Sequence, residues 1–182
     1  MKVKRYQQVE TDSLQEGDLL TIDGVQWIVI KADAEDITVQ QYDHIEDHVF
    51  NDDGSNKYEG SDLQEFLKEY RKRFKSKALG EFYILPMEAY EDGFLSDPRN
   101  RIRFNDNGYG TYYWTASPNV GGGGYVRYIT TSGTVGSYYA ITSYGVAPAC
   151  KLNLASFIGT DRCREELLTE IRDLLQKVAE AL

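Results

Sequence analysis

The stretch from Asn105 to Cys150 carries only two charged side chains, Asp106 and Arg127. At the chain-wide charged fraction of 27%, 46 residues would hold about twelve. Eight of the 14 tyrosines fall in this stretch, among many Gly, Ser, Thr and Asn residues. Short runs within 112–152, separated by Gly-rich or Ser-Gly breaks, predict β structure with a hairpin turn at 131–134.

The first part of the chain predicts a small antiparallel meander. Runs at 18–23 and 25–32 flank Asp23-Gly24, a strong hairpin signal, and a third run covers 36–42. Residues 43–60 are polar and predict a loop. A short strand is expected at 82–85, where Pro86 ends it.

Two helices are expected. Ser61 and Gln64 form a capping box at the start of the first, whose apolar face holds Leu63, Phe66, Leu67, Tyr70 and Phe74. Thr160 or Asp161 caps the second. Its broad apolar stripe comprises Leu167, Leu168, Ile171, Leu174, Leu175, Val178 and Leu182. Residues 91–111 are rich in turn formers and predict irregular structure.

Composition excludes several classes of protein. The net charge of −9 disfavours non-specific binding to nucleic acid and docking on an anionic membrane. We expect no membrane insertion, because no apolar run approaches about 18 residues, and no secretory signal. Two cysteines make no disulfide framework, and we expect Cys150 and Cys163 to be buried structural thiols. A cytoplasmic or phage-particle-associated protein is the expectation.

The uncharged segment admits two interpretations. Tyrosine supplies large contact area with few torsions, and Ser, Gly and Asn supply adaptable hydrogen bonds, as in an antibody paratope. The alternative is a tyrosine-rich β segment that packs internally. Lys, Glu and Gln number 32 in the chain, yet none lies between Thr115 and Cys150. Met and Trp are also absent there. None of these five residue types can be reached by changing the first two bases of AAY, the codon for asparagine.

Ordered motifs resemble a C-type-lectin-like domain family of bacteria and phages. The matching pieces include 17–33, 58–67 and 82–90. The late segment of that family typically has Trp-x-x-Ser-Pro, Gly-x-Val and Gly-Val-x-Pro-Ala. Residues 114–118, 133–135 and 145–149 match these in order. The resemblance covers about residues 15–155, so we expect an α+β fold with a lectin-like domain at 1–157 and a terminal helix at 158–182.

Some members of this fold are variable proteins of diversity-generating retroelements. The resemblance implies a rigid scaffold that displays altered residues, with Trp114, Pro118, Val126, Val135, Val146 and Pro148 fixed. The expected ligand-binding residues are Tyr112, Asn119, Gly121, Gly122, Gly123, Gly124, Tyr125, Tyr128, Gly136, Ser137, Tyr138, Tyr139, Ile141, Thr142 and Tyr144.

The motif search yields no catalytic or cofactor site. His44 and His48 have an i,i+4 spacing that binds zinc on a helix, but no third ligand is evident, and solvated loop histidines are the preferred interpretation. Gly121 to Gly124 lack the Gly-Lys-Ser/Thr of a phosphate loop. The basic run at 68–77 is expected to be a solvated helix face. We expect no metal, no cofactor and no enzyme.

Two functions remain open. The first is a binding module for a protein or cell-surface ligand, displayed on the tyrosine-rich surface. The second is a structural or assembly component of a phage particle. In the second case the terminal helix forms a homo-oligomer, although a broad stripe equally permits docking on the domain.

Overall fold

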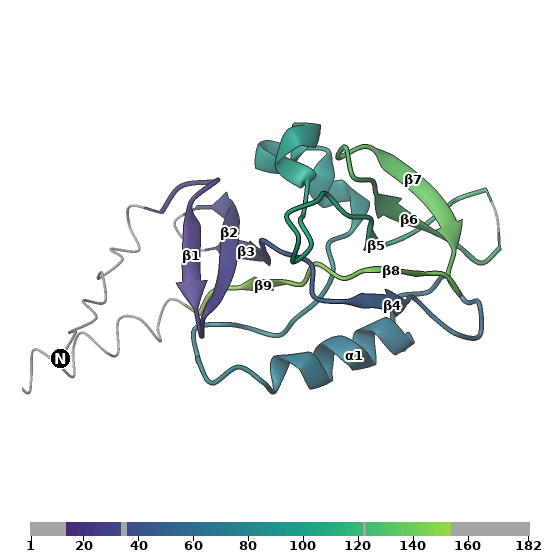
Figure 1. Ribbon diagram of the computed structural model, residues 1–182, viewed down its shortest axis with the longest axis horizontal. Helices are drawn as coiled ribbons and strands as arrows, with labels where there is room; N and C mark the ends of the chain where they lie inside the picture. The colour runs from purple at the N-terminus through teal and green to yellow at the C-terminus, as the bar shows by residue number, and fades with distance from the viewer. Residues whose placement is uncertain (1–13, 34–35, 122, 154–182) are drawn as a thin grey trace, which may run out of the picture.

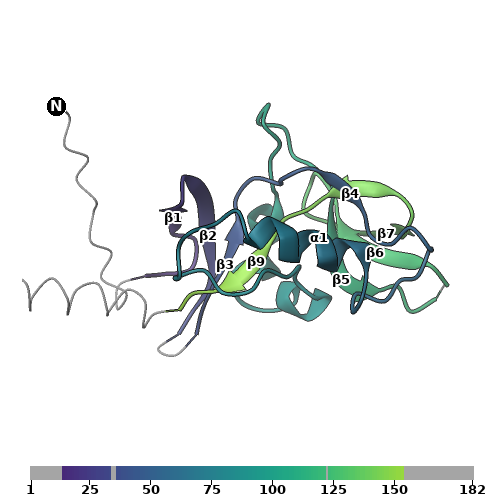
Figure 2. The same cartoon turned by 90° about the horizontal axis from the view of Figure 1, so that it is seen from below.

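Two β-sheets, one α-helix and three short 3-10 helices form the part of the chain described by the computed structural model, residues 14–33, 36–121 and 123–153. The predicted α+β class is therefore confirmed. The sheets lie side by side along the longest axis, with α1 below them and the 3-10 helices above (Figures 1 and 2). The predicted terminal helix, its caps, Cys163 and the 157/158 boundary lie outside these residues.

The first sheet begins with the predicted hairpin. Strands β1 (Leu19–Ile22) and β2 (Val25–Ala32) are antiparallel, with Ile22 opposite Val25. Between them Asp23 and Gly24 have φ of 51° and 82°. Two positive φ values in a two-residue loop match the twist of a tight hairpin, which explains the Asp-Gly pair.

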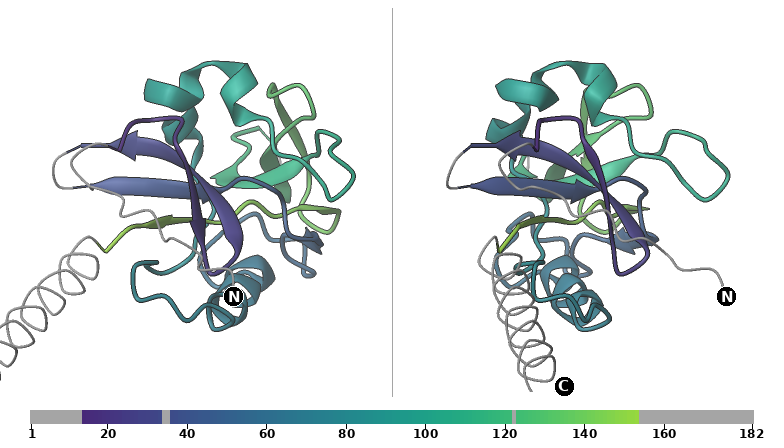
Figure 3. Two further views of the ribbon diagram at one scale, coloured as in Figure 1. Left: turned by 60° about the vertical axis from the view of Figure 1, so that its left-hand side comes forward. Right: turned by 90° about the vertical axis from the view of Figure 1, so that its left-hand side faces the viewer.

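Strand β9 (Ala149–Lys151) joins this sheet from the far end of the described chain. The order is β1-β2-β3-β9, and Val39 of β3 (Ile37–Gln41) lies opposite Cys150. The Gln40 side-chain amide donates to the Ala147 carbonyl at 3.2 Å. The two ends of the domain are thereby held together, and Figure 3 shows β9 beside the early strands.

The second sheet contains the uncharged segment. It has the order β4-β8-β5-β6-β7, with strands at Asp47–Val49, Ser143–Gly145, Tyr113–Pro118, Tyr125–Ile129 and Val135–Tyr139 respectively. The β prediction for 112–152 and the turn at 131–134 are confirmed. The loop predicted at 43–60 is interrupted by β4, which is too short to show an alternating pattern. Its position is set by β8, where Tyr144 lies opposite His48.

Helix α1 (Asp62–Arg71) begins as its sequence predicts. The Gln64 backbone N–H donates to the Ser61 hydroxyl at 3.2 Å, and the Gln64 side chain accepts from the Gly60 N–H at 2.9 Å. The reciprocal contact reaches Gly60 rather than Ser61, one residue earlier than in a standard capping box. Leu63, Leu67 and Tyr70 are buried, whereas Phe66 and Phe74 are partly exposed.

The segment between α1 and β5 is mostly irregular. The strand expected at 82–85 is absent; Tyr83 forms only an isolated bridge to Ala149. Three 3-10 helices follow, at Met87–Tyr90, Gly93–Ser96 and Pro98–Arg101. Arg101 binds this segment together by donating to the carbonyls of Leu95 at 2.6 Å and Tyr90 at 2.7 Å.

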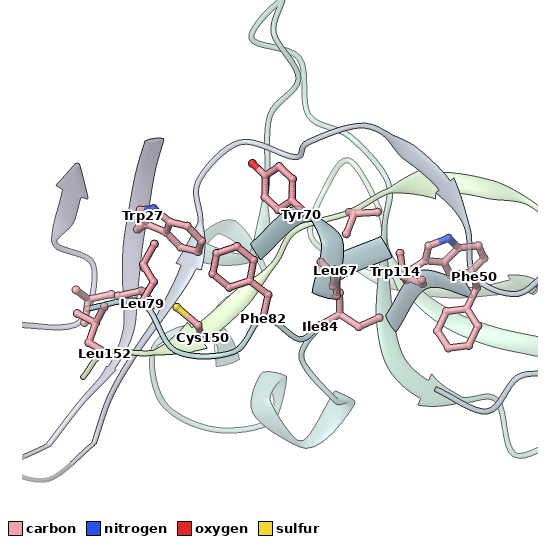
Figure 4. Packing of buried hydrophobic residues seen from close by; sticks show 14 of the residues in the cluster. Trp27, Phe50, Leu67, Tyr70, Leu79, Phe82, Ile84, Trp114, Cys150 and Leu152 are labelled. Atoms are coloured by element: carbon pink, nitrogen blue, oxygen red, sulfur yellow. The ribbon is translucent and has the colours of Figure 1, made fainter. Parts of the chain in front are cut away.

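A continuous row of apolar side chains underlies both sheets (Figure 4). Under the first sheet Trp27 contacts Phe82, with ring centroids 5.3 Å apart. Under the second, Trp114 contacts Phe50 edge to face at 5.8 Å. Cys150 is buried in the same row, as predicted, and burial raises the pKa of its thiol to about 12.

Arg103 is a buried cation that links β3 to the irregular segment before β5. Only 1% of it is exposed. Its guanidinium donates to the carbonyls of Asn100 and Ile102, each at 2.9 Å, and to the Gln40 side-chain oxygen at 2.5 Å. Gln40 therefore connects Arg103 on one side to Ala147 on the other. Neutral oxygens, rather than a carboxylate, replace the water that this charge loses.

We predict that Gln40→Met lowers the free energy of unfolding by about 3 kcal/mol. The substitution conserves volume but removes partners from two buried groups, at about 1–3 kcal/mol each. Gln26→Met, on the exposed side of β2, is the control and should change stability by less than about 0.5 kcal/mol. Urea denaturation measures both variants. Equal stability of the two would show that the Gln40 bridge contributes nothing.

Candidate binding surface

The register of the second sheet brings four tyrosines to one face. Tyr128 lies opposite Trp114, and Tyr138 lies opposite Val126. Successive side chains in a strand point to opposite faces, so Tyr128 shares its face with Val126 two residues away. Tyr144 of β8 reaches the same face and stacks on Tyr112, with centroids 5.5 Å apart.

Tyr144 is at the centre of this cluster. Its ring centroid lies 4.7 Å from that of Tyr128 and 6.2 Å from that of Tyr138. Beneath it lies the fully buried Trp114, at 4.8 Å. The Trp114 indole N–H donates to the His48 carbonyl at 2.9 Å, which fixes the floor of the cluster to β4.

A second pair of rings lies at the end of the sheet, on the opposite face of β6 and β7, because positions 125 and 139 alternate with 126 and 138. Tyr125 and Tyr139 lie opposite each other in register, with centroids 4.2 Å apart. A hydrogen bond to Tyr139 raises the pKa of Tyr125. Tyr139 also contacts Tyr138 edge to face at 5.7 Å. Six tyrosine rings are thus connected, four on one face and two on the other, with the Tyr138–Tyr139 contact joining the two sets. We call them the tyrosine surface: Tyr112, Tyr125, Tyr128, Tyr138, Tyr139 and Tyr144.

Some tyrosines of the segment are exposed, as a contact surface requires, and others pack internally. Tyr112, Tyr138 and Tyr139 are 42%, 45% and 47% exposed, and Ile141 beside them is 57% exposed. The remaining three rings of the tyrosine surface are half-buried, and Tyr113 on the opposite face is fully buried. The sequence did not reveal this division, because a shift of register by one residue exchanges the two faces.

Two of the expected ligand-binding glycines have structural reasons to be glycine. Gly124 has a φ of +79°, and a Cβ there would lie 2.9 Å from the Gly54 carbonyl oxygen. Gly136 lies under the Tyr128 ring, and a Cβ there would come within 2.4 Å of that ring. Gly121 and Gly123 have open space around them. Gly122 lies outside the described residues.

The polar residues of the predicted site form hydrogen bonds that hold the loops at the end of the sheet. The Asn119 backbone N–H donates to the Tyr125 carbonyl at 2.9 Å, and its side-chain amide donates to the Ser137 hydroxyl at 3.3 Å. The Thr142 N–H donates to the Tyr139 carbonyl at 2.9 Å. These bonds set the shape of the loops next to the tyrosine surface.

The expected scaffold positions also divide. Four of them are buried: Trp114, Val126, Val146 and Pro148. Pro118 and Val135 are exposed, and Val135 is 41% exposed. Their side chains are therefore not held by the core.

A hollow of about 450 Å³ between β4 and α1 was missed by sequence reasoning. Its lining combines a Phe66–His48 ring contact at 4.6 Å with four carboxylates: Asp52, Asp62, Glu65 and Glu69. The segments that meet there carry no shared motif, so the sequence gives no signal for it. Both histidines, expected to be solvated loop residues, are half-buried, and His48 lies in β4.

No metal cluster and no membrane-spanning helix occur in the described part of the chain. Within it, no group of three or more His, Cys, Asp or Glu side chains is arranged to hold a metal ion. Among the same residues, no helix has the length and apolar character needed to span a bilayer. Comparisons with protein-family models, curated proteins and solved structures find no match to this chain. The fold and the site together define a mixed α+β protein with an uncharged, tyrosine-rich sheet face.

We predict that the six tyrosines differ in their contribution to stability. Tyr144→Ala removes the ring that covers Trp114 and should lower the free energy of unfolding by roughly 2 kcal/mol. Tyr138→Ala should cost less than about 1 kcal/mol, because its ring is 45% exposed. Chemical denaturation measures both. A larger loss for Tyr138→Ala would place that ring in the core.

We also predict that the raised pKa of Tyr144 makes the protein less stable at high pH. Burial, followed by the neighbouring Tyr128, raises the pKa of Tyr144 from its ordinary value of 10.0 to about 12. The folded state therefore holds the phenolic proton more tightly than the unfolded chain, and its stabilisation is lost as the pH rises from 10 to about 12.

The test compares wild type with Tyr144→Phe, which keeps the ring but cannot ionise. Urea denaturation at about pH 9 and about pH 11 should show a smaller loss of stability for the variant. Identical losses would mean that the Tyr144 hydroxyl does not contribute to the alkaline transition.

Proposed function

We propose that this protein is a binding module whose tyrosine surface contacts a protein or cell-surface ligand. The observation that carries the proposal is the connected, partly exposed cluster of six tyrosines on one sheet, where Arg127 is the only charged residue of β5, β6, β7 and β8. Tyrosine and tryptophan dominate the energetic centres of protein interfaces. Their rings bury large areas and have few torsions to freeze.

An open sheet face favours a macromolecular ligand. Small molecules are usually held in concave sites that bury most of their surface. The tyrosine surface instead presents half-exposed rings on a sheet, together with the exposed Ile141. Hydroxyl groups at the ring edges can hydrogen-bond while the ring faces are desolvated. The chain's net charge of −9 makes nucleic acid a poor partner.

A C-type-lectin-like fold and a link to a diversity-generating retroelement form part of this proposal. They rest on the ordered motifs in residues 114–149. The division between buried Trp114, Val126 and Val146 and the exposed rings supports the proposal, since a varied surface requires stability from elsewhere. Exposed substitutions usually change stability by about 0.5 kcal/mol or less. Gly124 and Gly136 have structural constraints and are the least suited to variation.

The alternative is a structural component of a phage particle. It depends on the predicted terminal helix, which lies outside the described residues. In either case we propose a non-enzymatic role, in the cytoplasm or on a particle assembled there.

The binding proposal is tested with a displayed library. Six positions, Tyr112, Tyr125, Tyr138, Tyr139, Ile141 and Tyr144, are randomised to Tyr, Ser, Gly, Asn and Asp, and the library is selected against hen lysozyme as a model ligand. We expect folded members that bind lysozyme, and we expect their binding to be lost when the selected tyrosines are changed to alanine.

The matched control library randomises six exposed positions on and after α1: Glu65, Lys68, Glu69, Lys72, Arg73 and Lys75. It should yield folded proteins but fewer binders, because these positions lack the aromatic floor. Equal yields from both libraries would contradict the proposal. Sequencing of the genomic neighbourhood tests the retroelement link separately, through a near-copy of the stretch encoding 115–150 that differs at template adenines.

A further inference from the structure

Strand β7 is an uncovered edge of the second sheet. In the order β4-β8-β5-β6-β7 it has β6 on one side, and Figure 1 shows its other side at the outer margin of the described fold. The opposite edge, β4, is covered by α1, where Phe66 contacts His48 and the Leu63 N–H donates to the Phe50 carbonyl. One edge of the sheet is therefore covered by a helix, and the other is open.

The register shows which backbone groups of β7 point outward. The Thr130 N–H donates to the Thr134 carbonyl, and the Ala140 N–H donates to the Gly124 carbonyl. Both belong to the same antiparallel ladder, in which Arg127 lies opposite Ser137. Hydrogen-bonded pairs alternate along such a ladder, so even-numbered β7 residues face β6. The odd-numbered residues, Val135, Ser137 and Tyr139, direct their N–H and C=O groups away from it.

This edge has none of the usual protection against pairing. Natural edge strands carry Lys, Pro, bulges or inward charges that prevent addition of another strand. No charged residue and no proline lies between Arg127 and Gly145, and β7 itself reads Val-Gly-Ser-Tyr-Tyr. The free edge of the first sheet differs, since β1 is flanked by Asp18 and Asp23.

We propose that β7 pairs antiparallel with β7 of a second copy of this chain, about a two-fold axis at Ser137. A two-fold interface places the same patch on both copies and must be self-complementary. A strand of five residues whose central residue points its backbone outward meets this condition. Ser137 then lies opposite Ser137 of the second copy, and Val135 lies opposite its Tyr139.

The pairing satisfies backbone groups without breaking existing bonds. Ser137 exchanges two hydrogen bonds with its counterpart, and each Tyr139 N–H donates to the Val135 carbonyl of the other copy. The Tyr139 carbonyl already accepts from the Thr142 N–H at 2.9 Å, and a carbonyl oxygen with two lone pairs can also accept from the incoming Val135 N–H. Pairs of an aromatic and a β-branched side chain, as at Val135 and Tyr139, stabilise antiparallel strands.

The dimer joins the two five-stranded sheets through β7. It engages Tyr139 of each tyrosine surface, whereas Tyr112, Tyr128 and Tyr144 of both copies belong to parts of the sheet outside the paired strand. The inference does not rest on the proposed function, because it depends on backbone register and the absence of charge, and its test measures association of the chain with itself.

The test uses sedimentation velocity on the full chain between about 10 µM and about 1 mM. Two double variants change the same positions: Val135→Lys with Tyr139→Glu, and Val135→Glu with Tyr139→Glu. In the proposed register the first places opposite charges across the interface, and the second places like charges there. Within one chain the two positions are four residues apart on a strand, so they do not contact each other.

We expect wild type and the Lys/Glu variant to dimerise. The Glu/Glu variant should associate at least about tenfold more weakly than the Lys/Glu variant, and the difference should shrink at 1 M salt. Thermal denaturation checks folding, and Thr131→Lys with Ile141→Glu, outside β7, is the charge-matched control that should dimerise like wild type. A monomeric wild type, or a dimer affected equally by both double variants, would overturn the proposal.

Discussion

The pairing of β3 with β9 is the constraint on which the rest of the structure depends. It joins Val39 to Cys150 and so closes a loop that contains the whole second sheet. Closing a long loop costs conformational entropy, and local contacts do not offset that cost. The junction therefore needs strong side-chain support. Gln40 provides it by bonding Ala147 and the buried Arg103 at once. Because Arg103 is bound to carbonyls of the irregular segment, the same junction also positions the start of β5.

The tyrosine surface follows from that frame. Trp114 is buried against Phe50 and held by the His48 carbonyl, so β5 presents a fixed aromatic floor. Tyr128 and Tyr144 lie on this floor and are half-buried, whereas Tyr138 lies further out. Burial and exposure are therefore separated by depth on one sheet: the inner rings contribute to the core, and the outer ones are exposed, as the proposed binding role requires. Gly136 permits the arrangement, because any larger residue would move the Tyr128 ring.

Elements set by local chemistry were predictable from the sequence. The Asp23-Gly24 turn and the Ser61–Gln64 cap each depend on neighbouring residues, and both are present. The missed features depend on distant partners. Strand β4 exists because β8 lies beside it. The expected strand at 82–85 is an isolated bridge because Tyr83 alone pairs with Ala149, while Leu85 accepts from the Ala116 N–H. The candidate site was located as a segment, but which tyrosines are exposed depends on cross-strand register, and the sequence leaves that undetermined by one residue.

The long uncharged stretch has two physical causes, and only one of them concerns function. Residues 145–150 are all buried, so the absence of charge there follows from the cost of desolvating an ion. Among residues 135–144 only Ala140 is buried and half are exposed, so burial does not explain why this segment lacks charge. An exposed sheet face with an open edge is normally charged, because charge prevents unwanted association. Its absence from this part of the surface is the strongest physical reason to regard β7 and the adjoining rings as contact surface rather than as ordinary exterior.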